Sequence, residues 1–244
     1  MPFMGLPPLA ASALAIALAG LFGLLGGHWL ASVALRLPRI MEYDWDSQCR
    51  ELRGEAPRAT GRPGLSGSMA SHRRMARAMQ ACTAVLFAAC VWRFGVTPVA
   101  LCAMLFAAAL LVLGCIDLRT GLLPDAITQP LLWVGLLVNL VGTFATPEQA
   151  IVGAAVGYGF LWLLFQAFRR LTGLDGMGQG DFKFLAALGA WLGVAALPAI
   201  LIGASVAAVL LGVGAIALGR ARRGQPQPFG PYLAVAGIVS LFLQ

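Results

Sequence analysis

Charged residues are scarce in this chain. Asp, Glu, Lys and Arg make up 11% of its 244 residues, whereas a soluble domain carries about 25%. Hydrophobic residues make up 59%, and the mean hydropathy is +0.83. This composition excludes both a water-soluble globule and a disordered chain. The apolar stretches are continuous rather than alternating, which argues against a membrane β-barrel and for membrane-spanning helices.

The apolar stretches predict an all-α polytopic membrane protein with about eight transmembrane helices. The first stretch is expected to be a retained anchor, because no basic residue precedes it as in a secretory signal. Two of the others are short for a straight crossing, which takes about 20 residues. The predicted spans are 9–35, 78–92, 97–116, 127–145, 148–168, 182–195, 197–218 and 229–243.

The net charge of +7 is a signal of topology. When the eight spans alternate across a bilayer, every basic residue except Arg93 falls on one side. The positive-inside rule assigns that side to the cytoplasm and both chain ends to the other side. No pattern of aromatic and basic residues supports nucleic-acid binding, so no nucleic-acid partner is expected.

The longest polar segment runs from about Arg36 to Arg77. Its glycine, proline and serine residues, dense in 61–68, favour a mobile loop over a packed domain. We therefore divide the chain into a first transmembrane helix (1–36), a short cytoplasmic loop (37–77) and a membrane domain (78–244).

Cysteine forms no recognisable ligand pattern. Cys49 is alone in the loop, no CxxC pair occurs, and the two histidines lie far from any cysteine pairing. A structural zinc site needs about four such ligands in close order, so no zinc is expected. The other cysteines are interpreted as small hydrophobic residues of the apolar spans: Cys82, Cys90, Cys102 and Cys115.

Four of the ten acidic residues lie at the ends of apolar spans on the predicted cytoplasmic side: Asp117, Asp125, Asp175 and Asp181. Asp181 follows three closely spaced glycines, but the motif lacks the Gly-Lys-Ser/Thr of a phosphate-binding loop. If helix packing brings Asp117 and Asp181 together, two close carboxylates share one proton near neutral pH. One then activates water and the other protonates the departing group.

Each of these residues also has an interpretation in which its role is purely structural. Asp117 and Asp181 are also explained as helix N-caps or as partners of nearby arginines. Asp125 follows a proline and fits the start of a capped helix, and Asp175 fits a loop. Lys183 fits a side chain that marks the membrane interface.

Three blocks of the sequence stand out: Ile116–Trp133, Gly176–Trp191 and Pro228–Ala234. These blocks resemble the type IV prepilin peptidases, which are leader peptidase/N-methyltransferases of pilus and type II secretion systems. The resemblance implies an intramembrane aspartic protease of the GxGD type with Asp117 and Asp181 as catalytic acids. It also implies that Gly178, Gly180, Lys183 and Asp125 support the active site.

Family members cut a basic leader from prepilins or pseudopilins at the cytoplasmic face of the bacterial inner membrane. The resemblance therefore implies those substrates, that bilayer and 78–244 as the peptidase domain. The topology derived from the basic residues independently places Asp117 and Asp181 on the cytoplasmic side.

The first 75 residues match the family less well. Gly27 and Leu37-Pro38 follow its pattern, but His28 replaces a serine and Ala31 an asparagine. Many members also carry two CxxC pairs that bind zinc in the next loop, where this chain has only Cys49. Two alternatives follow: a bifunctional enzyme that also methylates the new N-terminus with S-adenosylmethionine, or a peptidase alone.

The sequence favours two other classes of function less strongly. A proton-coupled transporter requires acids near the bilayer midplane and broken helices in matching halves, and the sequence has neither. An assembly partner without catalysis is disfavoured because both acids and the glycine motif are present. The acidic stretch from Glu42 to Glu55 offers attraction for a basic leader, although a solvated mixed-charge loop is the preferred interpretation.

Overall fold

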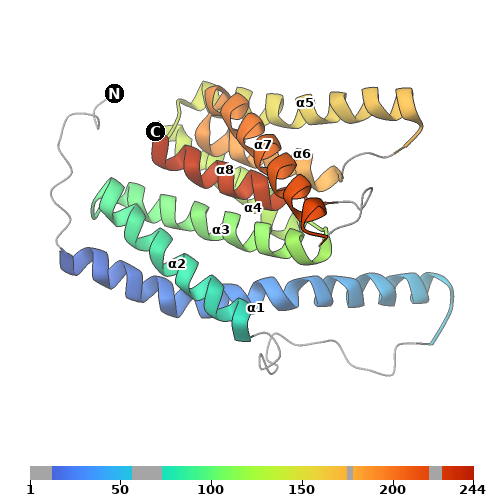
Figure 1. Cartoon of the computed structure of the whole chain (residues 1–244), viewed down its shortest axis with the longest axis horizontal. Helices are drawn as coiled ribbons and strands as arrows, with labels where there is room; N and C mark the ends of the chain where they lie inside the picture. The colour runs from blue at the N-terminus through green and yellow to red at the C-terminus, as the bar shows by residue number, and fades with distance from the viewer. Residues whose placement is uncertain (1–12, 57–72, 175–177, 220–226) are drawn as a thin grey trace. The chain divides into compact units, whose positions relative to one another are not determined.

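The computed structural model describes residues 13–56, 73–174, 178–219 and 227–244 (Figure 1). These residues form α-helices joined by short turns and two short 3-10 helices, η2 (Asn139–Val141) and η3 (Val194–Ala196), and they contain no strand. The α-helices are α1 (Ala13–Leu52), α2 (Arg73–Phe94), α3 (Pro98–Thr120), α4 (Asp125–Val138), α5 (Pro147–Thr172), α6 (Gln179–Leu192), α7 (Leu197–Ala217) and α8 (Gly230–Leu243).

The helices confirm the prediction of an all-α polytopic membrane protein. Five described segments are long and apolar enough to cross a membrane: α1, α2, α3, α5 and the segment from η3 through α7. The remaining predicted spans correspond to α4, α6 and α8, which have 14 residues each. Every predicted apolar span therefore corresponds to a helix.

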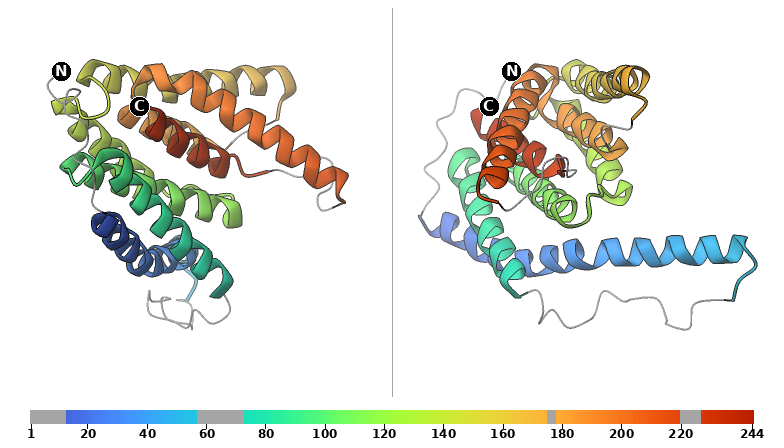
Figure 2. Two further views of the ribbon diagram at one scale, coloured as in Figure 1. Left: turned by 60° about the vertical axis from the view of Figure 1, so that its left-hand side comes forward. Right: turned by 45° about the vertical axis from the view of Figure 1, so that its right-hand side comes forward.

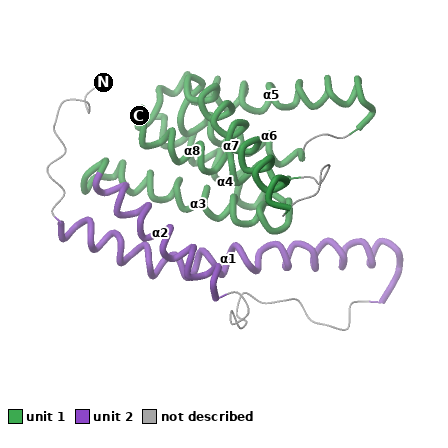
Figure 3. Tube along the Cα trace, in the orientation of Figure 1, with its two compact units in different colours: residues 1–10, 93–244 green, residues 11–92 purple. Residues whose placement is uncertain are grey.

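The chain divides into two compact units, residues 11–92 and residues 93–244 with 1–10 (Figure 3). In the first unit, α1 and α2 pack through two glycines of α1. A Cβ on Gly23 would lie 2.7 Å from the Thr83 carbonyl oxygen, and one on Gly27 would lie 2.7 Å from the Cα of Gln80. Small residues four apart allow helix backbones to approach this closely in membrane proteins.

Helix α1 extends past the predicted first span, 9–35, into the polar segment. It continues as one helix to Leu52 (Figure 2), so residues 37–52 are helical rather than part of a loop. Although Pro38 lies inside α1, no glycine or proline follows it until Gly54, just after the end of the helix. High polarity alone does not distinguish a solvated helix from a loop. The rest of the predicted loop, 57–72, lies outside the described residues.

Helix α6 is the centre of the second unit. Every residue from Phe182 to Leu192 is buried except Lys183. Two glycines of α5 allow this packing, because a Cβ on Gly153 would overlap the backbone of Gly189 and one on Gly157 the carbonyl oxygen of Leu185. Helices α5 and α6 thus pack through close backbone contact, together with ring contacts of Phe182 with Tyr158 and Phe165.

Asn139 supplies the polar contacts that end α6. Its side-chain amide donates hydrogen bonds of 2.8 Å to the carbonyl oxygens of Ala190 and Trp191. Its Oδ1 accepts the backbone N–H groups of Phe144 and Ala145 at 2.9 and 3.1 Å. The last carbonyls of a helix have no partner within the helix, so one fully buried side chain satisfies groups from two segments.

Replacing Asn139 with alanine is expected to lower the free energy of unfolding by about 3 kcal/mol, because buried carbonyl and amide groups lose their partners. The measurement is denaturant unfolding of the detergent-solubilised chain. Thr172→Ala is the matched control, since it removes an exposed hydrogen bond to the Phe168 carbonyl. Equal stability of the two variants would contradict the role given to Asn139.

Candidate active site

Asp117 lies in the last turn of α3 and is 4% exposed. Its Oδ2 accepts the backbone N–H of Gly230, at the start of α8, with a distance of 2.8 Å. Helix α3 is capped by Gly121, whose φ of +64° is readily adopted by glycine. The backbone N–H of Gly121 donates a hydrogen bond to the carbonyl oxygen of Asp117. The acid is therefore held at a helix end, with its side chain directed toward α8.

Gly230 leaves no room for a side chain. A Cβ at this position would lie 2.7 Å from Oδ2 of Asp117, well inside van der Waals contact. Farther along the interface, a Cβ on Gly114 would lie 3.1 Å from that of Ala234, so α3 and α8 pack closely. The amide groups at the start of α8 form the positive end of that helix, which suits a neighbouring carboxyl group.

Asp181 lies in the first turn of α6 and is 7% exposed. Its backbone N–H bonds to the carbonyl of Gly178, the residue that caps α6, at 3.2 Å. Burial removes Asp181 from solvent, and the carboxyl group of Asp117 is close enough to act on it electrostatically. Acids from two helices far apart in the sequence thus meet at one end of the unit.

The two glycines of the motif differ in their surroundings. A Cβ on Gly180 would lie 2.8 Å from that of Leu123, so glycine allows the connection between α3 and α4 to approach α6. A Cβ on Gly178 would lie 3.7 Å from Oδ2 of Asp181, which is an ordinary contact. Space therefore explains the glycine at 180 but not the one at 178.

Lys183 and Asp125 form an ion pair. The Nζ of Lys183 donates to both carboxylate oxygens of Asp125, at 2.8 and 2.6 Å. Helix α4 begins at Asp125, as the sequence predicts, with Pro124 in the N-cap position and no side chain bonding to the cap. Lys183 likewise does more than mark an interface. Asp175 lies outside the described residues.

The site contains a residue that the sequence analysis did not predict. Gly230 belongs to the third block of the resemblance, yet it was not among the expected site residues. Its glycine-proline pair lies at the start of the predicted span 229–243, on the same predicted side as Asp117 and Asp181. This position was the one feature of the sequence that pointed to Gly230. The residue type itself gives no indication, because nearly every residue has a backbone N–H group.

The geometry suits acid–base chemistry. Two buried carboxyl groups that act on each other cannot both carry a full charge at low cost, so such a pair holds a shared proton. It can therefore take a proton from water and give one to a leaving group in the same reaction.

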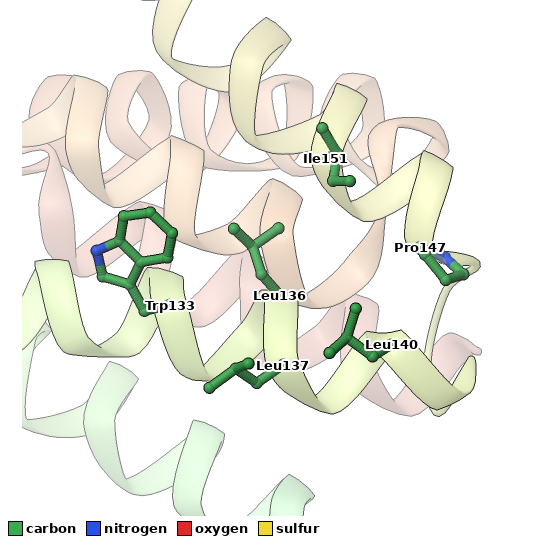
Figure 4. Close-up of a pocket in the computed structure, with 6 residues that line it drawn as sticks. All are labelled: Trp133, Leu136, Leu137, Leu140, Pro147 and Ile151. Atoms are coloured by element: carbon green, nitrogen blue, oxygen red, sulfur yellow. The ribbon is translucent and has the colours of Figure 1, made fainter.

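A groove on α4, η2 and the start of α5 is apolar (Figure 4). It contains no titratable side chain, and most of its residues are exposed as expected for contact with lipid chains. The groove is thus separate in character from the carboxyl pair. Its residues are Trp133, Leu136, Leu137, Leu140, Pro147 and Ile151.

Residues 104–213 match the model of the type IV leader peptidase family. A relative from Burkholderia pseudomallei, named prepilin leader peptidase/N-methyltransferase, is 50% identical over 149 residues, which are 61% of this chain and 48% of the relative. The chain thus spans about half the length of that relative. No solved structure matches the chain significantly.

Two relatives with the same name match over most of their length. The Pseudomonas aeruginosa protein is 38% identical over 254 aligned positions, covering 91% of this chain and 88% of the relative. The Stutzerimonas stutzeri protein is 39% identical over 267 positions, covering 96% and 92%. Such identity over nearly whole chains shows that this protein belongs to the type IV leader peptidase family.

Proposed function

We propose that this protein is an aspartic endopeptidase that removes the basic leader from type IV prepilins or type II secretion pseudopilins. Family membership supports the reaction class. The single observation that carries the proposal is the juxtaposition of Asp117 and Asp181, two buried acids from helices α3 and α6. An aspartic protease needs two neighbouring carboxyl groups. A structural role as a helix cap or in an ion pair with arginine would not require the two acids to lie together.

In this mechanism, the two carboxyl groups share one proton before the reaction. The ionised carboxylate takes a proton from a water molecule, whose oxygen bonds to the carbonyl carbon of the scissile peptide. The protonated carboxyl group gives its proton to the departing amine as the C–N bond breaks. The amide of Gly230 orients Asp117, and Gly180 lets the α3–α4 connection lie against the helix that carries Asp181.

The proposed site faces the cytoplasm from the bacterial inner membrane. The distribution of basic residues supports this orientation, because every one except Arg93 falls on the side of Asp117 and Asp181. A substrate whose basic leader precedes an apolar helix would then present its cleavage bond at this interface. The peptidase domain we propose is 78–244, which begins within α2.

The test is cleavage of a full-length prepilin by the purified chain in proteoliposomes, followed by mass spectrometry of the products. We expect one cut, between the basic leader and the apolar helix. An intact prepilin after long incubation with correctly inserted protein would contradict the proposal. Proton uptake by the same vesicles without cleavage would favour the transporter alternative.

Methylation of the new N-terminus with S-adenosylmethionine is the second proposed activity, supported by the relatives' names. A zinc site of four thiolates does not fit the segment 37–77, because Cys49 is its one cysteine. When S-adenosylmethionine is added, the cleaved product should become heavier by one methyl group. A cleaved product of unchanged mass would favour a peptidase without methyltransferase activity.

A further inference from the structure

The ion pair between Lys183 and Asp125 is too exposed to contribute much to stability. The Asp125 side chain is 58% exposed and that of Lys183 is 29% exposed. Ion pairs in such surroundings contribute about 0–1 kcal/mol. Yet the ammonium group contacts both carboxylate oxygens, at 2.8 and 2.6 Å, which fixes the two side chains relative to each other. The ion pair is therefore expected to affect the positions of neighbouring groups more than the stability of the fold.

The pair lies where it affects the geometry of the acids. Lys183 follows Asp181 by two residues in the first turns of α6, and Asp125 begins α4. The connection that leads to Asp125 starts after Thr120, three residues beyond Asp117 at the end of α3. The pair thus bridges the two chain segments that carry the acids.

A second contact bridges the same segments. Leu123 packs against Gly180, where a Cβ would lie only 2.8 Å from the Leu123 side chain. The contact between Leu123 and Gly180 restrains the distance between the segments, and the ion pair of Asp125 with Lys183 restrains their register. Together these contacts allow little sliding of α6 along the α3–α4 connection.

We propose that Asp125 and Lys183 are positioning residues whose ion pair sets the separation of Asp117 and Asp181. This inference rests on the proposed peptidase function for its activity readout. A misplacement of about 1 Å at a reacting centre can lower a rate by about 10²-fold. An exposed pair of little energetic value can therefore have a large effect on turnover.

The test compares Asp125→Asn, Lys183→Gln and the exchanged pair Asp125→Lys/Lys183→Asp in prepilin cleavage. Each single variant should lower kcat by about 10- to 100-fold with little change in KM. The exchanged pair should recover most of the lost kcat, because it restores the bridge with the charges reversed. An equally inactive exchanged pair would overturn the proposal, since the charge of Lys183 itself would then be what matters.

A matched control removes an exposed ion pair elsewhere. Glu55→Gln breaks the contact with Arg53, at 3.3 Å, where both side chains are more than 40% exposed. This variant should keep the wild-type kcat. Wild-type kcat in both Asp125→Asn and Lys183→Gln would overturn the positioning role.

Hydrogen–deuterium exchange gives a readout that does not depend on activity. The single variants should increase amide exchange in residues 118–125 and 178–183, and the exchanged pair should return it toward the wild-type level. Unchanged exchange in the single variants would overturn the proposal even in a chain that cleaves nothing. A wild-type chain that fails to cleave would instead refute the proposed function, so the two failures are distinguishable.

Discussion

Gly230→Ala is expected to lower the rate of prepilin cleavage by about 10²-fold or more. The new methyl carbon would lie 2.7 Å from Oδ2 of Asp117, so either the carboxyl group or the start of α8 must move. The backbone N–H that donates to Asp117 is retained. The expected loss therefore reports displacement of the acid rather than removal of a donor. The measurement is the cleavage rate per inserted enzyme.

Gly214→Ala is the matched control for this substitution. Gly214 lies in α7, and a Cβ there would meet no atom within 4 Å. Alanine also favours a helix over glycine by about 1 kcal/mol, so this variant should be as active and as stable as the wild type. Full activity in Gly230→Ala would contradict the close packing of α8 on Asp117.

Hydropathy was sufficient to predict the helices, because within lipid the N–H and C=O groups of each apolar span must form hydrogen bonds with one another. It failed for residues 37–52, where α1 continues with polar residues. The helix ends just before Gly54, the first glycine or proline after Pro38, so this residue locates the helix end better than polarity does. The contacts of Asn139 were not predictable either, because its partners are backbone groups of residues as distant in the chain as Ala190.

The composition of the candidate site was predictable, but its assembly was not. The position of Asp117 and Asp181 at the ends of apolar spans distinguishes both acids from the other acidic residues. The resemblance to the family then links them as a pair. Residue spacing contains no information on which helix ends meet. The same limit applies to Lys183 and Asp125, whose direct pairing depends on the packing of α4 against α6. Gly230 was not predictable because it contacts Asp117 through its backbone N–H, which does not depend on the residue type.

Asp117→Asn and Asp181→Asn are each expected to lower cleavage by about 10³-fold or more, since acid–base groups typically contribute about 10²–10⁴-fold. Asparagine has nearly the same size as aspartate, so the packing of the two buried sites should survive. It neither accepts the proton of water nor donates one to a departing amine. Because the acids act as one pair, the loss should be similar for both variants.

The most direct measurement is therefore single-turnover cleavage of one prepilin by membranes containing equal amounts of wild type, Asp117→Asn or Asp181→Asn. Protease protection and thermal unfolding of each chain establish that the variants are inserted and folded. We predict rapid cleavage by the wild type and almost none by either variant. Wild-type rates in either variant would contradict the central claim that these two acids form the catalytic pair.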